Sequence, residues 1–594
     1  MLSYVNYKVP ACQHESVPEH AVWGGLHRIP AACLRLIVLA MLLACSVAMA
    51  GSKVSADLQQ MMNQNKIEVL VQFNRIPTNT DAAQFASGQL LRRFRHVRAL
   101  HLRLTPAEIR ALVQNPAVTY MSPNRAVTGS LDITTQTVGA NAAWSAGLTG
   151  AGVGVAVVDS GIYPHDDLTV SGSKASRIVY SQSFVPGMTG NDLYGHGTHV
   201  AGIIGSNGKD STGAIFTRTF TGVAPNVNLI NLQVLDQNGA GTVSNVVAAI
   251  DQAITLKATY NIRVLNLSLG QPVYESYTLD PLCQAAEAAW SSGIVVVVAA
   301  GNAGRNMAGG LPLYGTIASP GNDPYVITVG ATNTHGSTNV SGDTIASYSS
   351  DGPTLIDHIV KPDLVAPGNN IVSLMAPNST LAATYPSSLV PTSYYQLLGF
   401  GTSSKYFCLS GTSMATPVVS GAAALLIQKN PSLTPDQVKA RLMKTASRMS
   451  NLYTTAQDVV HHFWFSNMAD IFTIGAGQVN INAALGNSDL VSVPAISPLA
   501  VMNSNGAVTL MFAQNIVWGT NIVWGTNIVW GTNIVWGTNI VWGTTVFSGL
   551  WLNNYAVLWA GAGANWVDPT NIVWGTSTLP PSLVQPFDAD DGDQ

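Results

Sequence analysis

The chain has 594 residues, of which 47% are hydrophobic and only 10% are charged, and its formal net charge is −4. This length exceeds that of one ordinary domain and predicts two or three folded units. The charge excludes the basic surface that nucleic-acid binding requires, so we expect no nucleic-acid partner. No Lys or Arg follows Arg448, and the acidic run at 588–593 is interpreted as a solvated tail.

The first 50 residues have the pattern of a secretory signal peptide. Two arginines precede an apolar run at 36–44, and the A-x-A sequence at 48–50 matches a cleavage site. The run is shorter than the ~20 residues of a membrane-spanning helix. We therefore predict a signal peptide over 1–50 and a secreted, extracellular protein. A lipoprotein-like box ending at Cys45 leaves lipid anchoring open as an alternative.

Residues 51–129 differ in composition from the rest of the chain and alternate between strand and helix patterns. A strand is predicted where charged and apolar residues alternate, and a helix where Thr105 and Pro106 supply an N-cap and a first helical position. This alternation indicates a small α+β unit. The predicted elements are strands at 66–73, 100–104 and 117–121, a helix at 82–94, and a helix starting at 106.

The next part of the chain contains apolar strands separated by helical stretches. Strands that are apolar throughout are buried on both faces, which indicates a mainly parallel, doubly wound sheet with helices on both faces. We therefore predict an α/β fold, whose active site gathers at the carboxyl ends of the strands. The predicted strands are 155–158, 228–234, 264–269, 294–300 and 325–329, and the helical stretches are 200–204, 242–260 and 285–291.

Three motifs supply a carboxylate, an imidazole and a hydroxyl. Asp159 ends the first strand, His196 lies in Gly-His-Gly-Thr-His-Val-Ala-Gly, and Ser413 lies in Ser-Gly-Thr-Ser-Met-Ala-Thr-Pro before a helix. The chain order Asp, His, Ser is one of the known orders of an acyl-transfer triad. Asp159 would fix the tautomer of His196, and His196 would take the proton of the nucleophile Ser413. Taken alone, each residue has a commoner structural role as a cap or turn.

Together with Asn302, which follows the 294–300 strand, these motifs resemble the subtilisin-like serine peptidases, the subtilase family. The resemblance spans about residues 132–484 and implies a catalytic domain over 130–487. It implies a serine endopeptidase that cuts protein or peptide substrates through an acyl-enzyme, with the Asn302 amide as the second oxyanion donor. The resemblance also implies that an enzyme of this kind needs no cofactor for its chemistry.

The resemblance also implies where the substrate binds. One wall of the pocket for the residue before the cut bond is formed by Ser268, Leu269 and Gly270, and the other by Ala299, Ala300 and Gly301. The substrate is expected to lie extended along exposed strand edges, as in strand addition. Small residues in both walls predict a roomy, apolar-tolerant pocket and broad specificity.

By position and pattern, residues 51–129 are similar to the inhibitory, fold-assisting propeptide of subtilases, of the I9 type. Such a propeptide blocks the cleft and helps to nucleate a slow, non-local sheet. It makes the chain a self-processing zymogen, with cleavage between roughly 124 and 131 and the propeptide as an intramolecular partner. The alternative is a permanent N-terminal domain.

Two insertions and two cysteines leave questions open. The loop at 206–221 occupies the place where many relatives hold calcium, so structural calcium stays possible but no metal ligand is assigned. A second long insertion lies between Gly368 and Ser410. Cys283 and Cys408 remain once the leader is removed, and the sequence does not decide whether they pair.

The last part, 488–594, contains a six-residue repeat, Asn-Ile-Val-Trp-Gly-Thr. The repeat runs in tandem from 515 to 544 and returns at 571–576. An even period keeps each side chain on one face of a strand, so we predict a strand-rich tail. Its tryptophans raise an alternative function. The chain would then be a surface- or cell-wall-attached protein whose peptidase domain serves mainly its own maturation.

Overall fold

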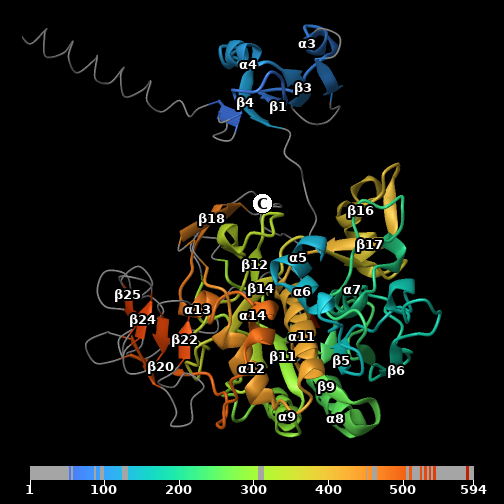
Figure 1. The fold of residues 1–594 in the computed structure, drawn as a ribbon, viewed down its shortest axis with the longest axis vertical. Coiled ribbons are helices and arrows are strands. Elements are labelled where there is room, and N and C mark those ends of the chain that lie inside the picture. Colours follow the sequence, from blue (N-terminus) through green and yellow to red (C-terminus); the bar gives the residue numbers. More distant parts are fainter. Residues whose placement is uncertain are drawn as a thin grey trace, which may run out of the picture. The chain divides into compact units, whose positions relative to one another are not determined.

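The structure is a computed structural model in which the chain divides into two compact units, Met1–Val127 and Thr128–Gln594 (Figure 1). It describes residues 53–54, 58–59, 61–85, 89–93, 99–123, 131–305, 313–449, 451, 453–457, 464–502, 508–511, 522–524, 528–530, 534–536, 540–542 and 583–586. The predicted signal peptide, the Cys45 box, residues 124–130 of the expected cleavage region and the acidic run at 588–593 lie outside the described residues.

The N-terminal unit is a small α+β fold. Its antiparallel sheet has the strand order β2-β3-β1-β4, and its core contains buried Val69, Leu102 and Ile109. Helix α4 begins after Thr105, which forms a capping box with Glu108. The elements are β1 (Ile67–Phe73), α3 (Asn79–Ala82), β2 (Leu90–Arg93), β3 (Ala99–Leu104), α4 (Pro106–Val113) and β4 (Val118–Pro123).

The predicted helix at 82–94 is wrong. Helix α3 has only four residues and ends at Ala82, and Leu90–Arg93 form the edge strand β2. Leu90 pairs with Leu102 of β3 across the sheet. The helical pattern reflects only the local sequence of this stretch. Pairing with β3 depends on another part of the chain, and this pairing makes residues 90–93 a strand.

The larger unit is built on an eight-stranded sheet of order β13-β12-β11-β9-β5-β7-β6, with β14 paired to β12. All its pairs are parallel except that of β13. This confirms the predicted α/β class with a mainly parallel sheet. The strands are β5 (Gly154–Asp159), β6 (Ile178–Ser183), β7 (Asn228–Gln233), β9 (Ile262–Leu267), β11 (Val295–Ala299), β12 (Ile327–Asn333), β13 (Thr344–Ile345) and β14 (Leu364–Pro367).

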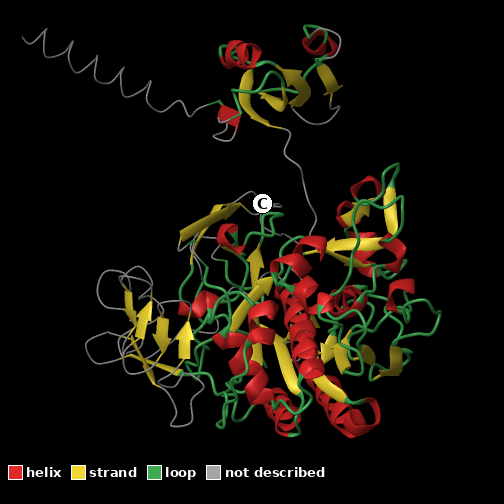
Figure 2. Ribbon diagram, in the orientation of Figure 1, coloured by secondary structure: helices red, strands yellow, loops and turns green. Residues whose placement is uncertain are grey.

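Helices flank this sheet (Figure 2). Helix α11 is buried over nearly its whole surface, from Thr412 to Ile427, and packs against β9, β11 and β12. A helix that is buried all round belongs to the core, which explains its small, apolar side chains. The helices are α5 (Leu131–Thr137), α6 (Ala140–Ser145), α7 (His196–Gly205), α8 (Val243–Tyr260), α9 (Pro281–Ser291), α10 (Thr380–Thr384), α11 (Thr412–Lys429), α12 (Pro435–Lys444), α13 (Ile471–Ile474) and α14 (Ile481–Gly486).

Smaller sheets surround this core. The second insertion forms a three-stranded sheet, β15-β17-β16, and the repeat forms antiparallel pairs β22–β23 and β24–β25. No helix among the described residues is long and apolar enough to cross a membrane. The strands are β8 (Gly241–Thr242), β10 (Leu269–Gly270), β15 (Ile371–Leu374), β16 (Leu389–Pro391), β17 (Thr402–Leu409), β18 (Tyr453–Gln457), β19 (Trp464–Met468), β20 (Leu499–Met502), β21 (Val508–Met511), β22 (Ile522–Trp524), β23 (Ile528–Trp530), β24 (Ile534–Trp536), β25 (Ile540–Trp542) and β26 (Leu583–Pro586).

A buried cluster of charges joins α12 to the sheet. One carboxylate oxygen of Asp363 lies 2.7 Å from the ammonium nitrogen of Lys361, and the other lies 3.1 Å from that of Lys439. All three side chains are at most 1% exposed. Burial acts to raise the pKa of Asp363, but the two ammonium groups outweigh it and hold the pKa below its usual value. Asp363 is therefore the counter-charge of Lys361 and of Lys439, whose pKa burial lowers to about 7 while Asp363 opposes the fall.

We predict that Asp363→Ala lowers the free energy of unfolding by about 3–5 kcal/mol, because it leaves two buried ammonium groups without their carboxylate. Urea unfolding in a Ser413→Ala background, which removes the predicted nucleophile, measures the change. The control is Asp489→Ala, whose partner Lys444 also lies on α12, but in an exposed pair. That control should cost at most about 1 kcal/mol. Equal effects of the two substitutions would contradict the prediction.

Candidate active site

Asp159 and His196 form a buried, hydrogen-bonded pair. Asp159 is the last residue of β5 and His196 is the first of α7. Oδ1 of Asp159 lies 2.7 Å from Nδ1 of His196, and both side chains are at most 1% exposed. A carboxylate oxygen accepts, so Nδ1 carries the proton and Nε2 presents its lone pair. This is the tautomer that a general base requires.

The first turn of α7 is held by a second buried carboxylate, Asp192. One of its oxygens accepts from the Gly195 N–H (2.7 Å) and the Ser160 hydroxyl (2.9 Å). The other accepts from the N–H (2.8 Å) and hydroxyl (2.6 Å) of Thr198. Burial raises the pKa of Asp192 to about 6, while these four donors oppose the rise. At neutral pH the carboxylate is thus ionised and fixes the backbone on both sides of His196.

Ser413 is the second residue of α11 and is tied to the end of β9. Its hydroxyl donates to the carbonyl oxygen of Ser268 (2.9 Å), and the Ser268 hydroxyl donates to the Ser413 carbonyl oxygen (2.9 Å). Ser268 is held in turn by the side-chain amide of Asn266 (2.9 Å). The start of α11 is therefore fixed to the strand that pairs with β5.

Strand register brings these residues to one edge of the sheet. In the parallel pair β5–β9, Val157 lies opposite Asn266. Two residues further along each strand are Asp159, which holds His196, and Ser268, which holds Ser413. Neighbouring strands lie about 4.8 Å apart, and helices α7 and α11 pack against each other. The three predicted catalytic residues thus gather at the carboxyl edge.

Asn302 follows β11 at the same edge, with its amide orientation set by Thr412. Its side-chain oxygen accepts from both the N–H and the hydroxyl of Thr412, each at 3.0 Å. A backbone N–H can only donate, so the oxygen must face Thr412 and the amide nitrogen must face away. That nitrogen is buried and has no hydrogen-bond partner among the described residues. It is a donor available to a ligand beside Ser413.

The two predicted pocket walls lie at neighbouring strand ends. Leu267 pairs with Val298, so the segments 268–270 and 299–301 continue from adjacent strands. All six residues are buried, and Leu269 and Gly270 form the short strand β10. At Gly301, φ is +109° and a Cβ atom would lie 2.8 Å from the Ser350 hydroxyl, so a glycine is required there.

Two site residues, Asp192 and Thr412, were not singled out from the sequence. Each lies within four residues of a predicted catalytic residue, which is the only signal that the sequence offered.

His199, in the same motif as His196, is structural. Its Nε2 lies 3.1 Å from the carbonyl oxygens of Ile371 and Phe407, and burial lowers its pKa to about 3, so it stays neutral.

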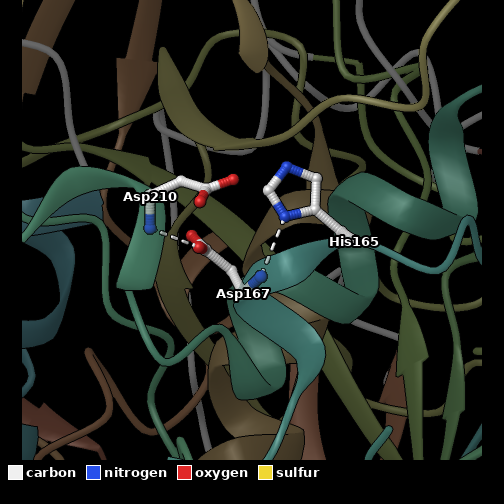
Figure 3. A group of neighbouring side chains, drawn as sticks. All are labelled: His165, Asp167 and Asp210. Carbon is white, nitrogen blue, oxygen red and sulfur yellow. Dashed lines mark hydrogen bonds between the residues drawn. The ribbon is translucent and has the colours of Figure 1, made fainter. Parts of the chain in front are cut away.

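His165, Asp167 and Asp210 are a group whose geometry could suggest a metal site (Figure 3). The Nδ1 atom of His165 already accepts the Asp167 N–H (3.1 Å), which puts the ring proton on Nε2. The Lys405 ammonium lies 3.0 Å from the Asp210 carboxylate and supplies the positive charge. Calcium takes six to eight oxygen ligands. Two carboxylates and one ring nitrogen supply fewer oxygen ligands than that, so these residues do not fit calcium.

Asp167 also accepts hydrogen bonds from Asp210 and from residues outside this group. The Asp167 carboxylate accepts from the Asp210 N–H (2.7 Å) and the Tyr406 hydroxyl (2.8 Å). Burial raises the pKa of Asp167 and lowers that of His165.

Cys283 and Cys408, whose pairing was left open, are both free thiols.

Comparison with known proteins agrees with this geometry. The Subtilase family model matches residues 150–469. The serine protease AprX of Bacillus subtilis (strain 168) is 38% identical over 407 residues, which cover 64% of this chain and 83% of that relative. Subtilisin Savinase of Lederbergia lenta is 38% identical over 319 residues, 53% of this chain and 92% of the relative.

A third relative, subtilisin E of Bacillus subtilis (strain 168), is 33% identical over 387 residues, which cover 64% of this chain and 84% of that protein. The matched region contains the sheet and every residue of the site described above. The chain belongs to the subtilase family of serine endopeptidases.

Proposed function

We propose that this subtilisin-like serine endopeptidase uses Ser413 as nucleophile, His196 as general base and acid, and Asp159 as the group that orients His196. The observation that carries the proposal is the buried bond from His196 Nδ1 to Asp159, which leaves Nε2 as the acceptor. Ser413 lies at the amino end of α11, and its hydroxyl donates to the carbonyl oxygen of Ser268, the residue that follows the adjacent strand β9.

The reaction then follows from these positions. Ser413 Oγ attacks the carbonyl carbon of the substrate while His196 Nε2 takes its proton, and Asp159 stabilises the imidazolium. The Ser413 N–H, at the positive end of α11, and the free amide N–H of Asn302 hold the oxyanion. His196 gives the proton to the leaving amine, and water, activated in the same way, releases the acyl group.

We further propose a secreted zymogen with broad substrate preference. The signal-peptide pattern over 1–50 supports secretion. The separate compact unit that ends at Val127 supports a removable propeptide over 51–129. The small residues 299–301 support a pocket that accepts large apolar side chains. The enzyme's partners are accordingly protein substrates and its own propeptide.

Ser413→Ala is expected to lower caseinolysis by roughly 10⁶-fold, the size known for loss of a subtilisin nucleophile. Because the same residue would remove the propeptide, intact mass should show residues 51–129 still attached. Ser145→Ala, an exposed serine on α6, is the control and should behave as wild type. A Ser413→Ala protein that still digests casein would refute the proposal.

Asn302→Leu is expected to lower kcat by ~10²–10³, a magnitude known from the corresponding donor of a subtilisin. The amide is needed only when the oxyanion forms, so KM for a peptide substrate should change little. Steady-state kinetics with a chromogenic peptide measures both constants. A change confined to KM would show that Asn302 contacts the ground state instead.

Asp192→Asn is expected to lower kcat/KM by about 10- to 100-fold, because its NH₂ group would face two donors and misplace His196. Titration with a serine-directed phosphonate reports the rate at which Ser413 reacts and should slow in parallel. Asp343→Asn, another buried carboxyl replacement that faces Gln478, is the matched control. Equal losses in both variants would mean that Asp192 is merely structural.

A further inference from the structure

The described part of the C-terminal tail ends in a strand that lies between two segments of the catalytic domain. Strand β26 (Leu583–Pro586) is the central strand of the sheet β10-β26-β8. On one side Gln585 lies opposite Gly270, and on the other Val584 lies opposite Gly241. Both pairings are antiparallel, and β8 and β10 do not pair with each other. The tail strand is therefore what joins these two segments into one sheet.

Backbone contacts on the far side of β10 turn Gly270 toward the tail. The Gln271 N–H donates to the Ser319 carbonyl oxygen (3.0 Å), and the Ser319 N–H donates to the Gln271 carbonyl oxygen (2.9 Å). Successive residues of a strand direct their backbone groups to opposite sides. The N–H and the carbonyl oxygen of Gly270 therefore both face β26, where they meet the backbone of Gln585.

Gly241 of β8 faces the tail for the same reason. Its other neighbour is Leu235, and in that pairing the Asp236 N–H donates to the Ala240 carbonyl oxygen (2.8 Å). Ala240 is thus bonded on the side away from the tail, which leaves the N–H and the carbonyl oxygen of Gly241 directed at Val584. Neighbouring strands lie about 4.8 Å apart, so a single strand fills the position between β8 and β10.

This position adjoins the candidate catalytic residues. Strand β10 begins directly after Ser268, whose carbonyl oxygen accepts the Ser413 hydroxyl. The partners of the tail along β10 are first Gly270 and then Leu269, so the tail runs in the direction of Ser268. The residues before the cut bond of a substrate must run the same way, because Ser413 attacks the carbonyl carbon at their end. The tail strand therefore has the direction that the acyl side of a substrate requires.

We propose that residues 583–586 are a built-in competitive inhibitor of the endopeptidase. This inference rests on the proposed function of Ser413 and adds regulation to the same site. A peptide that binds as an added strand uses backbone hydrogen bonds, whatever its sequence. The tail and a substrate thus compete for the backbone groups of Gly241 and Gly270. Because the tail is covalently attached, its local concentration there does not depend on protein concentration.

Competition of this kind changes one kinetic constant and not the other. Only molecules whose tail strand has left the position between β8 and β10 bind substrate, so the apparent affinity for substrate is reduced in proportion to their fraction. The tail therefore raises KM, whereas saturating substrate displaces it and leaves kcat unchanged. Loss of a strand that merely supports the fold would instead raise KM or lower kcat.

Two truncated proteins test the proposal, with a chromogenic peptide as substrate. A protein that ends at Ser582 loses β26, and its KM should fall about tenfold or more at unchanged kcat, since both ladder positions are lost. A protein that ends at Pro586 keeps β26 and should match the full-length enzyme. Equal KM values for the two truncated proteins would overturn the inference. Intact mass shows whether the full-length enzyme retains residues 583–586 after maturation, and their loss would overturn it as well.

A single substitution separates backbone pairing from the mere presence of the tail. Val584→Pro removes the N–H that faces the Gly241 carbonyl oxygen, in a strand that is paired on both sides. One ladder hydrogen bond is worth about 2- to 10-fold, so KM should fall by that factor with kcat unchanged. Val584→Ala keeps the N–H and should have the KM of the wild-type enzyme. Equal KM values for these two variants would overturn the proposal.

A free peptide provides an independent readout. Acetyl-Leu-Val-Gln-Pro-amide, which has the sequence of β26, should competitively inhibit the protein that ends at Ser582. The same peptide with a methyl group on the valine nitrogen lacks the N–H and should inhibit several-fold less. Equal inhibition by both peptides would contradict strand pairing. An enzyme that fails these tests but hydrolyses the chromogenic peptide keeps the proposed function of Ser413, whereas hydrolysis by the Ser413→Ala protein would overturn that function itself.

Discussion

The buried hydrogen bond between Asp159 and His196 is the interaction on which the rest of the site depends. A carboxylate without solvent is costly unless it is paired and hydrogen-bonded. Here Oδ1 accepts from the His196 ring and from the Ser160 N–H (2.7 Å). The pairing also selects the ring tautomer with the proton on Nδ1. The same hydrogen bond therefore stabilises the buried carboxylate and prepares His196 to act as a base. Asp192 extends this arrangement by holding the backbone around His196.

The carboxyl edge of the parallel sheet brings Ser413 and Asn302 to the same edge as the Asp159–His196 pair. Two helices start there, and each start is tied to a strand end by side-chain hydrogen bonds: α7 through Asp192, and α11 through Ser268 and Asn302. The strand segments 241–242 and 269–270 leave room between them for one more strand. The tail strand β26 takes that place. The candidate catalytic residues and the segments that pair with the tail strand therefore share one edge.

In the insertion at 206–221, charged side chains stabilise a loop. Its Asp210 and the neighbouring Asp166 both lie near the Lys405 ammonium, at 3.0 and 3.3 Å. The cation is a side chain from β17, so two insertions far apart in the sequence stabilise each other. Aromatic packing continues this contact, with the Phe220 and Tyr406 ring centroids 4.6 Å apart.

The sequence by itself determined the α/β class, five strands of the main sheet and the candidate catalytic residues. Apolar runs such as 155–158 are buried on both faces whatever their neighbours, and the motifs around Asp159, His196 and Ser413 carry their chemistry locally. Only the tertiary structure decided what depends on pairing between distant segments. Residues 90–93 form a strand because they pair with β3. Hydrogen bonds from Thr412 set the direction of the Asn302 amide. Strand β26 pairs with both β8 and β10. No local pattern encodes such partners, because their energy arises only once the fold brings them together.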